Sequence, residues 1–219
     1  MEEALSQATG HPAPFEEKEL REIRDVAVKY ASDTSVLRGL GALEIVILVG
    51  CDPVDINDLR RSPELGSVVI RDSGLISLVG AGELPMDKLT LPRNFIEDIE
   101  PLLGIKQQCE IDLTGNPLSE TSYREVLPEL SRRGHRVKAS GELPWLVTRR
   151  LHSAGVPVSC YRSSHGYRLC RPGLALTESP DYDHPVLTRE QVEELMAVDP
   201  SHALTYFERS ELVPRLLGP

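Results

Sequence analysis

One short pattern of apolar residues occurs four times between residues 43 and 123, and this repetition limits the folds open to the chain. The copies begin at Leu43, Leu65, Met86 and Gln108, so the steps between them are 22, 21 and 22 residues. They read LEIVILVGCDPVDIND, LGSVVIRDSGLISLVG, MDKLTLPRNFIEDIEP and QCEIDLTGNPLSETSY. Because several slots coincide in all four copies, chance periodicity is a poor explanation.

Each copy contains two apolar residues separated by one position, which predicts a short strand with both side chains directed inward. These pairs are Val46 and Leu48, Val68 and Ile70, Leu89 and Leu91, and Ile111 and Leu113. A small hydrogen-bonding residue follows each pair: Cys51, Ser73, Asn94 and Asn116. We expect this residue to turn the backbone and to bond peptide groups at the strand end. One such unit cannot bury its apolar side alone, so the units must stack.

The pattern resembles the leucine-rich repeat, L-x-x-L-x-L-x-x-N/C-x-L, whose period of about 20 to 29 residues includes the period of this chain. The resemblance covers roughly residues 15–139 and implies an α/β solenoid with short parallel strands. Steps of 21 and 22 residues leave little room for a full helix in each repeat. We therefore expect turns and 3₁₀ segments on the convex side, as in the slim bacterial members of this family.

The two ends of the repeat region differ from its centre. Residues 1–14 contain one glycine and two prolines without sustained periodicity, which predicts a flexible N-terminus. The segment REIRDVAVKY predicts a degenerate first strand, because Val26 and Val28 lie 20 residues before the next apolar pair. After residue 119, helical spacing up to Gly134 and the segment HRVKA predict a closing helix and a final strand.

Residues 140–219 lack the repeat and predict a small C-terminal α+β module of hairpin and helices. A helix is expected in ELPWLVTRRLHSAGV, and a β-hairpin in VPVSCYRSSHGYRLCRPG with its turn at 164–166. Thr188 followed by Gln191 predicts a capping box at the start of a further helix, and a last short helix is expected over 202–212. A module of this size is near the lower limit for independent folding, so we expect it to dock onto the repeats.

Composition favours an acidic, cytoplasmic protein. The net charge of -10 argues against general nucleic-acid binding and is compatible with a basic protein partner. No segment approaches the roughly 20 apolar residues of a membrane span, and the first residues lack signal-peptide architecture. Cys51 and Cys109 belong to the repeat interior and no C-x-x-C pair occurs, as expected in a reducing compartment.

In a leucine-rich repeat, the outward residues of the concave sheet are the natural binding surface. The second strand is apolar on both faces, so its outward residues and Val69 should form an exposed apolar patch with charges at its sides. The predicted partner-binding residues are Ile45, Ile47, Val49, Val69, Arg71, Glu110 and Asp112. Three alternatives remain: the C-terminal segment covers the patch, the register slips by one residue, or two copies associate weakly.

The hairpin segment carries the clearest local excess of positive charge. Five arginines and no acidic residue lie between Trp145 and Pro172, and aromatic residues lie among them. Arginine beside aromatic rings suits phosphate, carboxylate or single-stranded nucleic acid. The candidate anion-binding residues are Arg149, Arg162, Arg168 and Arg171. Alternatively, these arginines pair with the acidic residues of 178–194 or of the repeats and hold the module in place.

The sequence offers no catalytic or metal-binding motif, so we expect neither an enzyme nor a cofactor. Cys160 and Cys170 are expected to face each other across the hairpin, with His165 and His184 nearby, yet this spacing matches no familiar zinc pattern. The chain has no Gly-rich phosphate loop, H-E-x-x-H or G-x-S-x-G.

The sequence therefore predicts a protein-protein interaction module, monomeric or weakly dimeric, that binds and regulates or neutralises a partner. Its compact acidic form resembles bacterial repeat proteins, including immunity proteins of toxin systems. The alternative function is binding of nucleic acid or a phosphate ligand by the hairpin.

Overall fold

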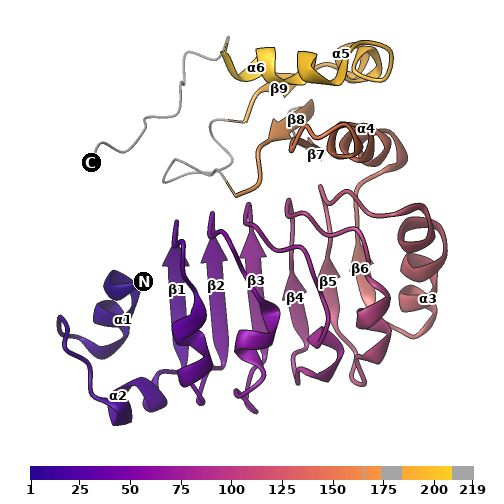
Figure 1. The fold of residues 1–219 in the computed structure, drawn as a ribbon. Helices are drawn as coiled ribbons and strands as arrows, with labels where there is room; N and C mark the ends of the chain where they lie inside the picture. The colour runs from indigo at the N-terminus through magenta and orange to yellow at the C-terminus, as the bar shows by residue number, and fades with distance from the viewer. Residues whose placement is uncertain (165, 174–183, 209–219) are drawn as a thin grey trace.

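The computed structural model describes residues 1–164, 166–173 and 184–208. Six strands form one parallel sheet in chain order, and their C-terminal ends point toward a smaller C-terminal module (Figure 1). The strands are β1 (Asp25–Lys29), β2 (Ile45–Val49), β3 (Ser67–Arg71), β4 (Lys88–Thr90), β5 (Glu110–Asp112) and β6 (Arg136–Lys138). The predicted sheet of short parallel strands is confirmed.

The strands pair in the register that the repeat predicts. Val46 lies opposite Val68, Val68 opposite Leu89, and Leu89 opposite Ile111, and all four side chains are buried. The intervening residues therefore lie on the other face of the sheet, which we call the open face: the outward side chains of β1 to β6. A slip by one residue is excluded, since it would expose these apolar side chains.

The four small residues after the strands form the predicted row of hydrogen bonds. The Cys51 N–H donates to Ser73 Oγ (3.1 Å), the Ser73 N–H to Asn94 Oδ1 (3.2 Å), and the Asn94 N–H to Asn116 Oδ1 (3.1 Å). Asn94 Nδ2 also donates to the carbonyl of Ile70 at 2.8 Å. Each side chain thus satisfies buried peptide groups of its neighbour, which stacks the repeats and confirms the predicted role.

Short 3₁₀ segments return the chain from one strand to the next, as the step length predicts. These segments are Ser35–Gly39, Ile56–Leu59, Ala81–Glu83 and Glu100–Gly104. The last repeat has a longer helical return, a π-helical turn (Ser122–Val126) followed by α3 (Leu127–Arg132). Within the described ranges, no helix has both the length and the apolar character needed to cross a membrane.

The first fourteen residues differ from the expected flexible end. They contain α1 (Glu2–Thr9), and α2 (Glu17–Glu22) follows before β1. Ala4 and Leu5 are buried and join the same apolar cluster as Ile23 and Val26. Helix α1 therefore covers the end of the core beside β1, an opening that would otherwise expose apolar side chains to water.

The C-terminal residues form α4 (Glu142–Ser153), a hairpin of β7 (Ser159–Ser163) and β8 (Gly166–Cys170), the short β9 (Val186–Leu187), and the helices α5 (Arg189–Glu194) and α6 (Thr205–Glu208). Strand β8 lies between β7 and β9 in one antiparallel sheet. A 3₁₀ segment (Pro200–Leu204) precedes α6, and residues 209–212 of the expected last helix lie outside the described residues. Thr188 and Gln191 form the capping box at the start of α5.

The expected juxtaposition of Cys160 and Cys170 is wrong. Cys170 lies opposite Ser159, and Cys160 lies opposite Leu169, so the two cysteines are one position out of register. Successive side chains of a strand point to opposite faces, which turns Cys160 into the module and Cys170 toward the sheet of repeats. No disulfide joins the four cysteines, all of which lie in the described residues.

Two apolar clusters build the molecule, and α4 belongs to both. Trp145 packs with the repeats, whereas Val147 and Leu151 pack with the hairpin and α5. Residue 140, the boundary predicted between repeats and module, lies two residues before this shared helix, and the division into domains stays a prediction.

Candidate functional site

One left-handed residue follows each of the first five strands. These residues are Tyr30 (φ 56°), Gly50 (φ 64°), Asp72 (φ 53°), Arg93 (φ 56°) and Gly115 (φ 77°). Glycine adopts this conformation at little cost, whereas another residue costs about 1–3 kcal/mol and persists only where its surroundings hold it. The chain therefore accepts backbone strain at Asp72 and Arg93, where a glycine would fit the repeat.

Asp72 and Arg93 form a buried ion pair on adjacent repeats. Arg93 Nε donates to Asp72 Oδ1 at 2.5 Å and Arg93 Nη2 donates to Asp72 Oδ2 at 3.0 Å. Burial disfavours the charged carboxylate, yet the hydrogen bonds and charge of Arg93 prevail and hold the pKa of Asp72 below its usual range. Burial also opposes the Arg93 charge, but Asp72 raises the pKa of that guanidinium. Both groups are therefore charged at neutral pH.

The C-terminal module docks on this pair, at a contact region that we call the joint. The Cys170 thiol donates to Asp72 Oδ1 at 3.2 Å, and the Arg93 guanidinium lies over the Tyr161 ring, 4.7 Å from its centroid. The Gly173 N–H donates to the carbonyl of Asp72 at 2.8 Å. Glycine suits this position, because φ is 75° and a Cβ would lie 2.7 Å from Asp52 Oδ2, so another residue would be strained and would displace the Asp52 side chain.

A second contact holds the module at the far end of the repeats. Trp145 of α4 is fully buried, stacks on Tyr123 with ring centroids 3.8 Å apart, and donates its indole N–H to the carbonyl of Leu118 at 2.7 Å. The module thus spans from the last repeat back to the third strand. The hairpin is fixed beside the C-terminal ends of the strands, as Figure 1 shows.

A cavity of about 810 Å³ lies where the hairpin meets the open face, and we call it the groove. Its apolar lining includes the predicted residues Ile47, Val49 and Val69. Its polar lining includes Lys29, Arg71, Asp112, Lys138, Arg162 and Arg168. The structure therefore brings together the strand residues and the hairpin arginines that the sequence suggested as two separate sites.

The open face continues beyond the groove in both directions. Ile45 is 41% exposed and, with Ile47, lines a hollow of about 500 Å³ beside α1. At the other end, Glu110 and Asp112 line a hollow of about 480 Å³. Val49 is only 4% exposed and contributes little to the surface. The exposed apolar patch is therefore smaller than the sequence predicts.

The predicted charged residues are divided between the groove and structural contacts. Glu110 accepts a bond from Arg136 (2.8 Å) and Asp112 from Lys138 (2.7 Å), so β6 supplies a cation to each carboxylate. Two further arginines lie away from the groove: Arg149 pairs with Glu120, and Arg171 lies over the ring of Phe207. Arg149 therefore makes the kind of contact expected under the alternative interpretation, in which the arginines of this segment pair with acidic residues of the repeats and hold the module in place.

Sequence reasoning missed Asp72, Arg93, Tyr161 and the role of His184. Asp72 and Cys170 are 98 residues apart, and no local motif joins positions that distant. A signal was nevertheless present in the repeat, because Asp72 and Arg93 occupy the slot that glycine fills in two other copies. A charged residue in a glycine slot indicates a side chain held there for a contact.

No family model matches the sequence, and no curated protein matches it. Among solved structures, internalin C2 from Listeria monocytogenes is similar at 14% sequence identity and a TM-score of 0.41, covering 67% of this chain and 77% of that chain. The leucine-rich-repeat-like fold is defined here by the register of the strands and the row of Cys, Ser and Asn side chains.

Proposed function

We propose that this protein binds another protein through the groove between the open face and the hairpin. The observation that supports this proposal is the shared lining: Ile47 and Val69 come from the sheet, and Arg162 and Arg168 come from the hairpin. Protein interfaces combine an apolar centre with a polar rim, in which arginine is enriched. The groove has both parts on a rigid scaffold of stacked strands.

The charges of the groove favour an acidic segment of that partner. Lys29 and Arg162 are both exposed, and within the described residues neither forms an ion pair. The overall charge of -10 alone favours a basic partner, but the carboxylates of Glu110 and Asp112 are already engaged by β6. We therefore propose a partner segment with an apolar side chain for the strand residues and a carboxylate for the cationic rim.

The apolar half of the proposal is tested by Ile47→Asp. A charge placed on the floor of the groove would be desolvated on binding, so capture of the partner from the native cell should be lost. Ile76→Asp is the matched control, because Ile76 is 67% exposed and lies outside the groove lining. A protein retained by wild type and Ile76→Asp but not by Ile47→Asp supports the proposal; equal retention by all three removes it.

The cationic half is tested by charge reversal. Arg162→Glu should weaken the complex at low salt and reduce its salt dependence, since a rim charge contributes chiefly to association. Lys106→Glu changes the net charge equally at an exposed residue outside the groove lining. If the two variants bind alike, the partner does not use the hairpin rim.

Binding of nucleic acid or another phosphate ligand is the second candidate, because Arg162 and Arg168 line one cavity. Such binding should weaken steeply with salt and disappear in the double variant Arg162→Glu, Arg168→Glu. Ile47→Asp should affect phosphate binding less than protein capture. Retained binding by the double variant would contradict this candidate.

We further propose that occupation of the groove regulates or neutralises the partner, as immunity proteins do, within the cytoplasm. The protein would act as a monomer or a weak homodimer, so sedimentation at several concentrations should show mainly one copy. An activity assay of the captured partner, with wild type and Ile47→Asp added in turn, tests regulation directly.

A further inference from the structure

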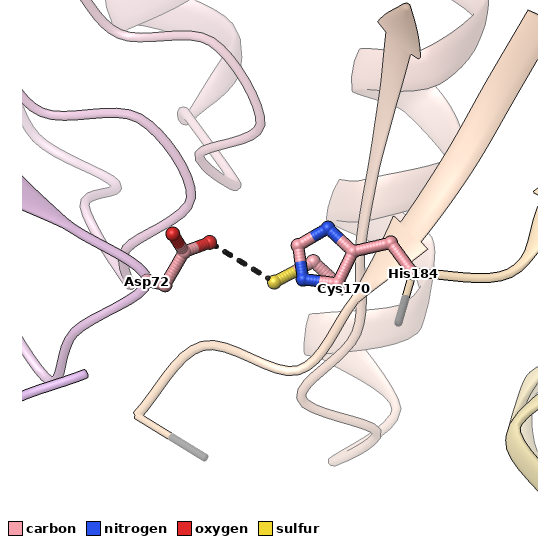
Figure 2. A group of neighbouring side chains, drawn as sticks. All are labelled: Asp72, Cys170 and His184. Carbon is pink, nitrogen blue, oxygen red and sulfur yellow. Dashed lines mark hydrogen bonds between the residues drawn. The ribbon is translucent and has the colours of Figure 1, made fainter. Parts of the chain in front are cut away.

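Three side chains that commonly bind metal ions meet at the joint. Asp72 follows β3, Cys170 ends β8, and His184 precedes β9; all three are buried (Figure 2). One ligand atom from each, a carboxylate oxygen, a sulfur and a ring nitrogen, lies within 4.8 Å of the other two. We propose that this cluster binds a divalent transition-metal ion, with zinc as the best fit.

The three donor atoms, an oxygen, a sulfur and a nitrogen, indicate which metal ion the cluster would bind. Calcium and magnesium prefer oxygen ligands alone, whereas thiolate with imidazole suits zinc. Asp72 Oδ1 and Cys170 Sγ are 3.2 Å apart. Bond lengths of about 2.0–2.3 Å around tetrahedral zinc place neighbouring ligands roughly 3.5 Å apart, so these two atoms would need to move only slightly. Three protein ligands leave the fourth position to water or another group.

Neighbouring side chains already orient two of the ligands. The Tyr161 hydroxyl is 2.7 Å from His184 Nδ1, so a proton on Nδ1 can be held there while Nε2 carries the lone pair for the metal. In Figure 2, the ring edge opposite the Cβ attachment is turned toward Cys170. Arg93 holds both carboxylate oxygens of Asp72 in place. Tyr161 and Arg93 would therefore act as positioning residues.

Metal binding replaces a proton at the site. In the metal-free protein the Cys170 thiol donates to the Asp72 carboxylate, and on binding this proton leaves to solvent while sulfur bonds to the metal. Among these described groups, the charges of a divalent ion and Arg93 exceed those of Asp72 and the thiolate by one positive charge when His184 is neutral. The site therefore favours an anionic group, such as hydroxide or a carboxylate, in the fourth position.

The metal would join two parts of the chain. Asp72 belongs to the repeats, whereas Cys170 and His184 belong to the module, and 98 residues separate Asp72 from Cys170. The ion would thus fix the hairpin over the sheet. This inference does not rest on the proposed binding of a partner, because it can be tested without one.

The first measurement is metal content. The full chain is stripped with a chelator, incubated with zinc and desalted. We expect one retained zinc per chain, lost in Cys170→Ala and kept in Cys160→Ala. Cys160 is the matched control, because it is a buried cysteine of the same hairpin whose side chain lies on the opposite face from that of Cys170. Equal retention by both variants would place zinc elsewhere and overturn the proposal.

The second measurement uses cobalt in the wild-type protein, so it does not depend on folding of a variant. A thiolate-to-cobalt charge-transfer absorption should appear at one equivalent of added cobalt. Tyr161→Phe should weaken zinc binding about 10- to 100-fold, because the imidazole loses the group that orients it. If the wild-type protein neither shows this cobalt absorption nor binds zinc, the proposed site does not exist.

Discussion

The repeats and the joint are held together in opposite ways. In the repeats, one kind of contact recurs: each small side chain after a strand bonds the backbone of its neighbour. At the joint, each contact occurs once, among them the Asp72–Arg93 pair and the Gly173 hydrogen bond. Repetition distributes stability over many similar contacts, whereas the joint concentrates it in a few buried polar groups.

This difference predicts how each region responds to a single change. A lost contact in the repeats should cost the free energy of that contact and leave neighbouring repeats in place. A lost contact at the joint should strand a charge or polar group in a buried site, which costs more.

The largest expected effect is that of Asp72→Asn, measured as the free energy of unfolding in the presence of a chelator. Asparagine keeps the side-chain size and tolerates the left-handed conformation, so the charge is the main change. Arg93, with 8% of its side chain exposed, would lose the Asp72 carboxylate, which accepts two of its hydrogen bonds. We expect a loss of about 3–5 kcal/mol.

Asp58→Asn is the matched control for the Asp72 prediction. Asp58 is also buried, but its partner Arg38 has 61% of its side chain exposed and remains hydrated when the carboxylate is neutralised. Its loss should be near the value of about 1 kcal/mol or less that is usual for exposed pairs. Adding Arg93→Met to Asp72→Asn should recover much of the stability. Equal losses for Asp58→Asn and Asp72→Asn would mean that burial of the partner is unimportant.

A smaller effect is expected from acid at a third contact between the module and the repeats, where His152 meets Phe95. The His152 ring of α4 lies edge-on to Phe95, 5.4 Å between centroids, and its Nε2 is buried with no hydrogen-bond partner in the described residues. Burial lowers the pKa of His152 to about 4. The folded state therefore binds this proton less readily than the unfolded state, and stability falls as pH decreases from 6.5 toward 4.

The acid-dependent loss should reach about 3 kcal/mol at the low end of that range. Carboxylates also titrate there, so the measurement is the difference between unfolding curves of wild type and His152→Leu at each pH. The variant should lack the His152 contribution and lose less stability on acidification. Parallel curves would show that His152 is protonated alike in the folded and unfolded states.

The same comparison explains what the sequence could predict. Periodicity identified the strands, their register and the row from Cys51 to Asn116, because each recurs at a fixed step and stacking gives every copy the same surroundings. Thr188 and Gln191 were equally predictable, since a capping box depends on residues three apart.

The joint was not predictable in this way. Its contacts join Asp72 and Arg93 to Tyr161, Cys170 and His184 across a change of architecture, and no spacing rule connects them. The register of the hairpin was also not determined by the sequence, so Cys160 was placed opposite Cys170. The groove residues were named, but their meeting in one cavity depends on where the module docks.

The smallest effect is expected within the row of repeats, from Ser73→Ala. This change removes the acceptor for the Cys51 N–H and the donor to the Arg71 carbonyl, both in buried or half-buried surroundings. Because only two hydrogen bonds are lost, we expect a cost of about 1–2 kcal/mol. Ser73→Asn should cost less, since asparagine makes the equivalent contacts at Asn94 and Asn116. Unfolding in urea measures both variants. A Ser73→Ala loss as large as that of Asp72→Asn would mean that the repeats depend on single contacts as strongly as the joint does.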